Sequence, residues 1–116
     1  MSNPRAPAPI KYEFVPSIST KAIDLSGLFK KNIYSQVGFE SCGFQYLVER
    51  IGDDEIIIFC KHDQAKYLVQ HITCYYHMSG AVHKLRFLCP KTNKRCATLF
   101  LVGGIWASRA AHGLRV

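Results

Sequence analysis

From residue 44 onward, the chain consists of short runs that are separated by turn-forming residues; most of these runs alternate apolar and polar residues, and the run at 55–60 is a β-branched stretch that suits a central strand. Alternation with a period of two is typical of β-strands that bury one face. Because each run follows the previous one after a short turn, we expect the strands to pair in an antiparallel meander of about five to seven strands. The runs cover residues 44–51, 55–60, 67–77, 81–88, 96–102 and 105–108.

The first part of the chain has a different pattern. Residues 1–10 contain three prolines, which fix φ and lack an N–H donor, so we expect an extended Pro-rich arm here. Residues 11–15 alternate and predict a short strand before the next proline. Residues 17–32 carry a partial apolar face at helical spacing, with Ser19 or Thr20 as the capping residue, and predict one short helix.

Length and composition limit the fold to one globular domain, which we place in residues 11–116. The 116 residues, of which 48% are hydrophobic, can bury a single core. The expected fold class is α+β and mainly β: an antiparallel meander sheet, one short N-terminal helix, and metal-free, zinc-ribbon-like hairpins over residues 81–116. The chain has no bilayer-length apolar run, no secretory signal pattern in residues 1–10, and an odd number of cysteines. We therefore expect a cytoplasmic protein with reduced thiols and no membrane partner.

Positive charge is concentrated in the second half of the chain. Residues 1–60 hold six basic and seven acidic residues, whereas residues 61–116 hold nine basic residues and one acid. This asymmetry favours a polyanion or an acidic protein surface as partner, and the alternative is a solvated basic face without a ligand. The residues that we expect to bind nucleic acid or another partner are Lys84, Arg86, Lys91, Lys94, Arg95 and Arg109.

Three aromatic residues in the same half of the chain are candidates to lie near these cations, where they would stack on bases or form a protein interface. They are Tyr67, Tyr75 and Trp106. An exposed aromatic ring beside cations favours contact with a nucleobase. The alternative is that tyrosine and tryptophan fill the core, where they bury a large apolar area.

The stretch around Cys89 has the layout of a zinc knuckle, with an apolar run, Cys-Pro, a polar turn and a second apolar run. The usual Cys-x-x-Cys pair is incomplete, because Thr92 stands at the second position. Cys96 follows too far round the hairpin, and the second turn offers His112 and Ser108, of which serine is a poor zinc ligand. We therefore expect no metal and no other cofactor. If zinc is bound, its candidate ligands are Cys89, Cys96 and His112.

Two further clusters combine residue types that occur in metal sites and active sites. His71, Cys74 and His77 have metal-ligand spacing, but on a strand the cysteine lies on the opposite face from both histidines. Cys60 and His62 suggest a nucleophile with its base, yet no glycine-rich turn that could form an oxyanion hole lies near them. We expect no catalytic site and no enzymatic activity.

The C-terminal third contains a series of short motifs. In order, they are Arg86-Phe87-Leu88-Cys89-Pro90, Thr92-Asn93-Lys94-Arg95-Cys96, Leu99-Phe100-Leu101, Gly103-Gly104, Trp106-Ala107-Ser108-Arg109 and Gly113-Leu114. This series resembles a family of small, largely uncharacterised bacterial and phage-borne proteins with a degenerate zinc-ribbon end. Some members keep Cys-x-x-Cys pairs, which this chain replaces at Thr92, Ser108 and Ala111. The resemblance implies no activity, but it implies a ribbon held by the packing of Phe87, Leu99, Leu101 and Trp106.

Together these features predict a non-enzymatic binding module that contacts nucleic acid or a nucleoprotein complex through its basic C-terminal surface. The alternative is a protein–protein inhibitor or adaptor of phage or mobile-element origin, of the anti-defence type. Small size and the lack of a catalytic set fit both functions. The sequence leaves the identity of the partner and the oligomeric state open.

Overall fold

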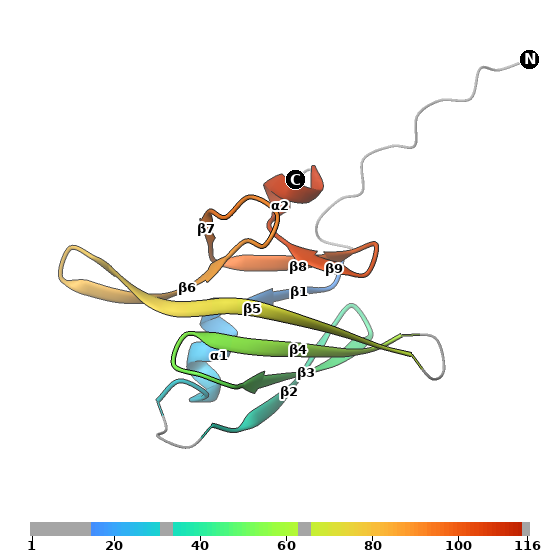
Figure 1. The fold of residues 1–116 in the computed structure, drawn as a ribbon, viewed down its shortest axis with the longest axis horizontal. Coiled ribbons are helices and arrows are strands. Elements are labelled where there is room, and N and C mark those ends of the chain that lie inside the picture. Colours follow the sequence, from blue (N-terminus) through green and yellow to red (C-terminus); the bar gives the residue numbers. More distant parts are fainter. Residues whose placement is uncertain (1–14, 31–33, 63–65, 115–116) are drawn as a thin grey trace, which may run out of the picture.

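A computed structural model describes residues 15–30, 34–62 and 66–114, which form nine strands and two helices (Figure 1). The predicted arm at residues 1–10 and most of the predicted strand at 11–15 lie outside these described residues. In chain order, the elements are β1 (Ser17–Ser19), α1 (Thr20–Ser26), β2 (Gln36–Ser41), β3 (Phe44–Arg50), β4 (Glu55–His62), β5 (Lys66–Ser79), β6 (Val82–Leu88), β7 (Arg95–Cys96), β8 (Thr98–Val102), β9 (Ile105–Ala107) and α2 (Arg109–His112).

The larger sheet has six strands in the order β2-β3-β4-β5-β6-β7, and each neighbouring pair is antiparallel. Spatial order follows chain order, which confirms the predicted antiparallel meander and the mainly-β class. The long strand β5 joins the two halves of the sheet, because it pairs with β4 from Lys66 to Thr73 and with β6 from Cys74 to Ser79. Figure 1 shows β5 crossing the molecule.

The smaller sheet, in the order β1-β8-β9, corrects the predicted hairpin between residues 81–88 and 96–102. Among the described residues of β6, only Phe87 and Leu88 pair with β7. After Ala97 the chain enters β8, which pairs with β1 and β9 instead of continuing beside β6. The C-terminal strands therefore form a second layer and not an extension of the meander.

The burial of β8 explains why it leaves the larger sheet. Leu99, Phe100 and Leu101 are consecutive and all buried. A strand with one solvated face buries only alternate residues, so β8 needs cover on both faces. Leu99 and Leu101 belong to the main core, whereas Phe100 packs with Val15 and Leu114 on the other side.

The helix α1 confirms that a short helix capped by Ser19 lies within the predicted range 17–32, but it covers only Thr20–Ser26, and residues 17–19 form β1 instead. The Ser19 hydroxyl accepts a hydrogen bond from the Ala22 N–H at 3.1 Å, which satisfies a donor of the first turn. The helix ends at Gly27, whose φ of 78° lies in the left-handed region that favours glycine. α1 packs against β1 and β6 and closes one side of the core.

The main core lies between the two sheets and α1. Burial of apolar surface is the largest favourable term in folding, and this cluster draws on both sheets and the helix. The four residues expected to hold the C-terminal end by packing, namely Phe87, Leu99, Leu101 and Trp106, all belong to it. Its other buried members are Ile18, Ile23, Leu28, Tyr46, Val48, Ile56, Ile58, Cys60, Ile72, Cys74 and Leu85.

The last element, α2, is a single helical turn that ends before Gly113. The Ser108 hydroxyl accepts a hydrogen bond from the Ala111 N–H at 3.2 Å, and Gly113 ends the turn with a φ of 66°. The turn packs against β8 and directs Leu114 onto Phe100. Neither helix in the described part of the chain is long and apolar enough to cross a membrane.

Candidate nucleic-acid interface

The outer face of the β5–β6 pair carries two of the predicted cations. Leu85 is buried in the core, so its neighbours Lys84 and Arg86 extend from the opposite face of the strand. The register places Tyr75 opposite Arg86, and His77 opposite Lys84. Cross-strand neighbours on one face lie within reach of each other, so this end of the sheet presents cations beside a tyrosine and a histidine.

The turn between β6 and β7 and the first residue of β7 together supply three more cations. The turn is closed by two backbone hydrogen bonds, from the Asn93 N–H to the Cys89 oxygen at 2.8 Å and from the Cys89 N–H to the Lys94 oxygen at 2.9 Å. Asn93 has a φ of 60°, a conformation that asparagine adopts more readily than most residues. Lys91, Lys94 and Arg95 are exposed around this turn.

A hollow of about 440 Å³ lies between this turn and the outer face of β5. It is lined by Tyr75, Leu88, Asn93, Lys94 and Arg95. The register pairs Leu88 with Arg95, so both extend from the face that carries Tyr75. The lining thus combines an aromatic ring, an apolar side chain, an amide and two cations. We call it the Tyr75 hollow.

A second hollow, of about 560 Å³, adjoins the same two cations. Lys94 and Arg95 line it together with Arg109 of α2 and with the polar side chains of Thr98 and Ser108. The fold therefore brings Arg109 to the cations of the β6–β7 turn, although they are separated in the sequence by two strands. Lys94 and Arg95 border both hollows, and we call this pair the basic ridge.

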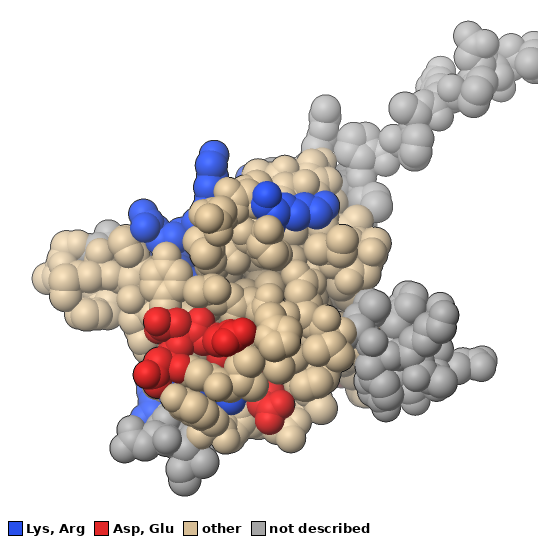
Figure 2. Space-filling model, viewed as in Figure 1, with Lys and Arg blue, Asp and Glu red and all other residues tan. Residues whose placement is uncertain are grey.

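The six predicted binding residues, Lys84, Arg86, Lys91, Lys94, Arg95 and Arg109, form what we call the basic surface. Figure 2 shows lysine and arginine side chains gathered near β6, β7 and α2, whereas acidic side chains gather around the left end of β4. Within the described residues, Lys91, Lys94 and Arg95 form no ion pair with a carboxylate. Their charges are therefore available to an external anion.

One carboxylate does approach the basic surface. Asp24 of α1 lines a shallow hollow together with Lys84 and Arg86. Its Oδ1 accepts a hydrogen bond of 2.8 Å from the Tyr76 hydroxyl. This contact holds α1 against β5 and places the acid at the margin of the basic surface, away from the basic ridge.

Cys89, the residue that follows β6, is buried, and its sulfur accepts a hydrogen bond of 3.4 Å from the Ser108 N–H. The N–H and hydroxyl groups of Ser108 and Thr92 are the donors that favour its thiolate. Burial by itself raises the pKa of this thiol, but these donors stabilise the thiolate and lower the pKa to about 6. The structure thus brings together three residues that the sequence pattern named separately.

The other two candidate zinc ligands have different surroundings. Cys96 packs against the main core, and burial together with the nearby Cys89 sulfur raises the pKa of its thiol to about 11. The Nε2 atom of His112 lies 2.9 Å from the Phe100 oxygen and 3.1 Å from the Ile105 oxygen. In the part of the chain that the structure describes, no three His, Cys, Asp or Glu side chains converge to hold a metal ion.

The three aromatic candidates occupy different positions. Trp106 is 1% exposed and packs on Tyr46 with ring centroids 5.1 Å apart, so it belongs to the core and cannot stack on a base. Tyr75 is half-buried and lines its hollow. The side chain of Tyr67 lies outside the described part of the structure.

The first of the two clusters that resemble metal sites and active sites is divided between two strand faces, as the strand pattern predicts. Cys74 is buried, whereas His71 is exposed on the other face of β5. Cys60 is buried in the main core, and burial raises the pKa of its thiol, which disfavours a nucleophilic thiolate. The side chain of His62 lies outside the described residues.

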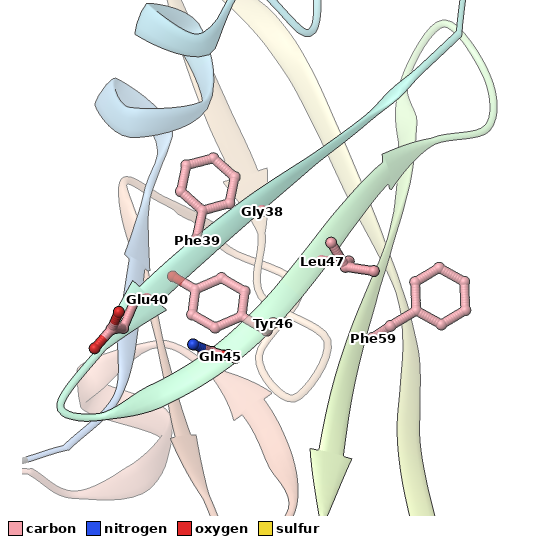
Figure 3. Close-up of a pocket in the computed structure, with 7 residues that line it drawn as sticks. All are labelled: Gly38, Phe39, Glu40, Gln45, Tyr46, Leu47 and Phe59. Atoms are coloured by element: carbon pink, nitrogen blue, oxygen red, sulfur yellow. The ribbon is translucent and has the colours of Figure 1, made fainter.

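One hollow has no counterpart among the sequence predictions. It measures about 550 Å³ and is lined by Gly38, Phe39, Glu40, Gln45, Tyr46, Leu47 and Phe59. Figure 3 shows Leu47 and Phe59 next to each other on one side of these strands, with Phe39 and Tyr46 toward the other side. The register continues from Phe59 to Val69, so Leu47, Phe59 and Val69 form an apolar row across β3, β4 and β5.

Comparisons with known proteins do not add a family to this picture. No family model, no curated protein and no solved structure matches the chain. The features of this chain that point to a function are therefore the basic surface, the basic ridge and the two hollows beside it.

Proposed function

We propose that this chain is a non-enzymatic binding module that contacts nucleic acid, alone or in a nucleoprotein complex, through the basic surface. One observation carries the proposal: the basic ridge borders two adjoining hollows, Arg109 of α2 lines one of them, and Arg86 of β6 lies opposite Tyr75, which lines the other. Phosphates repeat along a nucleic-acid strand, so cations from several elements along one surface can each bind one.

The binding energy would come mainly from phosphate contacts. Each phosphate that a lysine or arginine neutralises releases condensed counterions, so the logarithm of the association constant falls linearly with the logarithm of salt concentration. If all six cations of the basic surface bind phosphates, the slope of that plot is about −4 to −5. Contacts of this kind carry no sequence information, so oligonucleotides of unrelated sequence should bind with similar affinity.

Reversing the charges of the turn tests this proposal. In a Lys91→Glu, Lys94→Glu, Arg95→Glu variant, we expect the affinity for an oligonucleotide to fall at least about 100-fold at low salt. The salt slope should become less steep by about 2 to 3, because three phosphate contacts are lost. Fluorescence anisotropy titrations at several salt concentrations measure both quantities.

A matched pair of single variants separates local contact from net charge. Lys30 is exposed just after α1 and is not part of the basic surface. Lys94→Glu and Lys30→Glu change the net charge equally, yet we expect only Lys94→Glu to weaken binding by more than about twofold, because salt screens distant charges. Equal losses in both variants, or wild-type binding that does not weaken at high salt, would contradict the proposal.

We further propose that the end of the chain from β6 to α2 is a ribbon-like unit that lacks its metal ligands, as the resemblance implies. The spacings Cys89-x-x-Thr92 and Ser108-x-x-Ala111 correspond to two zinc knuckles. In support, the Ser108 N–H donates to the Cys89 sulfur, Ser108 and Thr92 both lower the pKa of the Cys89 thiol, and the Ser108 hydroxyl accepts a hydrogen bond from the Ala111 N–H. Hydrogen bonds to Cys89 and the packing of the main core take the place of a metal.

Restoring cysteine at these positions should create a zinc site. We expect the Thr92→Cys, Ser108→Cys, Ala111→Cys variant to bind one Zn²⁺ per chain and to gain stability that a chelator removes. Zinc content after dialysis and the unfolding midpoint with and without chelator measure the effect.

The control adds Cys89→Ala to the same three changes. This control variant keeps the three introduced cysteines but lacks Cys89, the fourth ligand of the proposed site. We therefore expect it to bind zinc more weakly and to gain little stability from zinc. Two results would show that residues 89, 92, 108 and 111 do not form a ligand set. One is equal zinc uptake by the triple variant and by its control without Cys89. The other is no zinc uptake by the triple variant.

The alternative function, a protein–protein inhibitor or adaptor of phage or mobile-element origin, is favoured by a different observation. The apolar row on the outer face is unusually accessible, with Leu47 44% and Val69 52% exposed, and β2 beside it is an edge strand. Exposed apolar side chains in a row are typical of protein interfaces. A chain that binds no oligonucleotide at low salt, but retains a protein partner from nuclease-treated lysate, would favour this alternative.

A further inference from the structure

Tyr75 differs from the other tyrosines whose side chains the structure describes. The hydroxyls of Tyr34, Tyr46 and Tyr76 each donate a hydrogen bond of 2.7 or 2.8 Å to a distant segment of the chain. Within the described residues, the Tyr75 hydroxyl has no such bond, and its ring is half-buried beside an open hollow. Within the described residues, the Tyr75 hydroxyl therefore does not link one strand or helix of the fold to another.

The surroundings of Tyr75 combine the two chemistries of a nucleotide. The register sets Arg86 directly opposite Tyr75, and the basic ridge lines the same hollow. Leu88 adds an apolar contact. A nucleobase has a flat π-face and is joined through its sugar to a phosphate, so an aromatic ring with cations around it can bind both parts at once.

The position of the ring discriminates between single strands and duplexes. In a duplex, each base is paired and stacked between its neighbours, so its faces are covered and mainly phosphates reach a cationic surface. Tyr75 lies on the sheet, in a hollow bounded by the β6–β7 turn, and does not project as a wedge. A single strand can turn an unstacked base into this hollow while its phosphates stay on the basic ridge.

We propose that the basic surface selects single-stranded nucleic acid, with one base stacked on Tyr75 and the flanking phosphates bound by Arg86 and the basic ridge. The inference rests on the proposed function, because it names the form of nucleic acid that the same surface binds. Stacking tolerates any base, since every base has a π-face, so selection is for unpaired nucleotides and not for a sequence.

Three probes of about ten nucleotides test the selection: single-stranded oligothymidylate, a duplex of equal length, and an abasic strand with the same phosphates. We expect the wild-type chain to bind oligothymidylate at least about tenfold more tightly than the other two. Tyr75→Ala should lower the affinity for oligothymidylate about 5- to 100-fold and change the affinity for the duplex and the abasic strand less than about twofold.

Two variants and one control keep the result interpretable. Tyr75→Phe keeps the ring and should bind oligothymidylate like the wild type, whereas Tyr75→Leu keeps apolar bulk without the ring and should behave like Tyr75→Ala. Tyr34→Ala removes an exposed tyrosine outside the basic surface and should have no effect. The abasic probe tests stacking on the wild-type chain even if a variant folds poorly.

The outcomes separate the two proposals. Preference for oligothymidylate that Tyr75→Ala and Tyr75→Leu abolish, with Tyr75→Phe unchanged, supports single-strand selection. Equal, salt-dependent affinity for all three probes overturns single-strand selection and leaves the proposed function intact. Absence of binding to every probe at low salt overturns both.

Discussion

Replacing Trp106 with alanine is expected to lower the free energy of unfolding by about 3–5 kcal/mol, the range for removing a large aromatic side chain from a well-packed core. The indole is 1% exposed, and its ring lies against Tyr46 of the larger sheet. Trp106 therefore fills the space between the two sheets. Its removal leaves a cavity that backbone shifts in β9 can close only in part, because Gln70 also holds that strand.

Urea unfolding followed by far-UV circular dichroism measures this effect without depending on tryptophan fluorescence. The unfolding midpoint should fall while the dependence of the unfolding free energy on urea stays unchanged. Ile105→Ala is the matched control, because Ile105 precedes Trp106 in the same strand and is 43% exposed. This substitution should lower the free energy of unfolding by less than about 0.5–1 kcal/mol. A loss below about 1 kcal/mol for Trp106→Ala would mean that the indole does not fill the space between the sheets.

Side-chain faces along the meander could be predicted because they depend only on a period of two. Lys84 and Arg86 had to share a face, and Cys74 had to oppose His71, whichever strands lay beside them. The burial of Cys74 and Leu85 confirms this alternation. The outer face of β5 and β6 is therefore the part of the candidate site that local pattern determines.

The pairing of strands, unlike the direction of side chains along one strand, could not be predicted from local pattern, because paired residues lie far apart in the sequence. The pattern predicts that the run at residues 96–102 returns beside residues 81–88, but from Thr98 on it pairs with β1 and β9, and Ile18 of β1 lies opposite Leu99. The partner strand β1 has only three residues, which are too few to show an alternation of apolar and polar positions in the sequence. The strand β2 is not predicted for a related reason, since it contains only two large apolar residues, Val37 and Phe39, which are too few to establish an alternation.

The remaining parts of the site depend on this second layer. Charge asymmetry predicted the cations, but Arg109 reaches Lys94 and Arg95 only because β8 and β9 fold back over the larger sheet. The same layer decides the role of Trp106: an amphipathic ring can bind a partner or fill a core, and contact with Tyr46 determines which.

Gln70→Ala is expected to lower the free energy of unfolding by about 2–4 kcal/mol, because it removes two hydrogen bonds that join the sheets. Gln70 Nε2 donates to the Trp106 oxygen at 2.9 Å, and the Trp106 N–H donates to Gln70 Oε1 at 2.7 Å. The amide thus pairs with the backbone of β9 as a neighbouring strand would. Without it, a donor and an acceptor beside a buried residue lose their partners. Thr73→Ala, an exposed change on the same strand, should be nearly neutral.

Gln70→Glu distinguishes these two bonds from a general loss of packing, because it changes hydrogen bonding with little change in shape. The new carboxylate can accept from the Trp106 N–H, but it cannot donate to the Trp106 oxygen, so only the protonated acid can make both bonds. Folding therefore favours the protonated form and raises its pKa above the unfolded value of about 4.3. The stability relative to wild type is then highest below about pH 4 and falls as the pH rises through that raised pKa. A stability difference that is the same at pH 4 and pH 7 would show that the bond to the Trp106 oxygen contributes nothing.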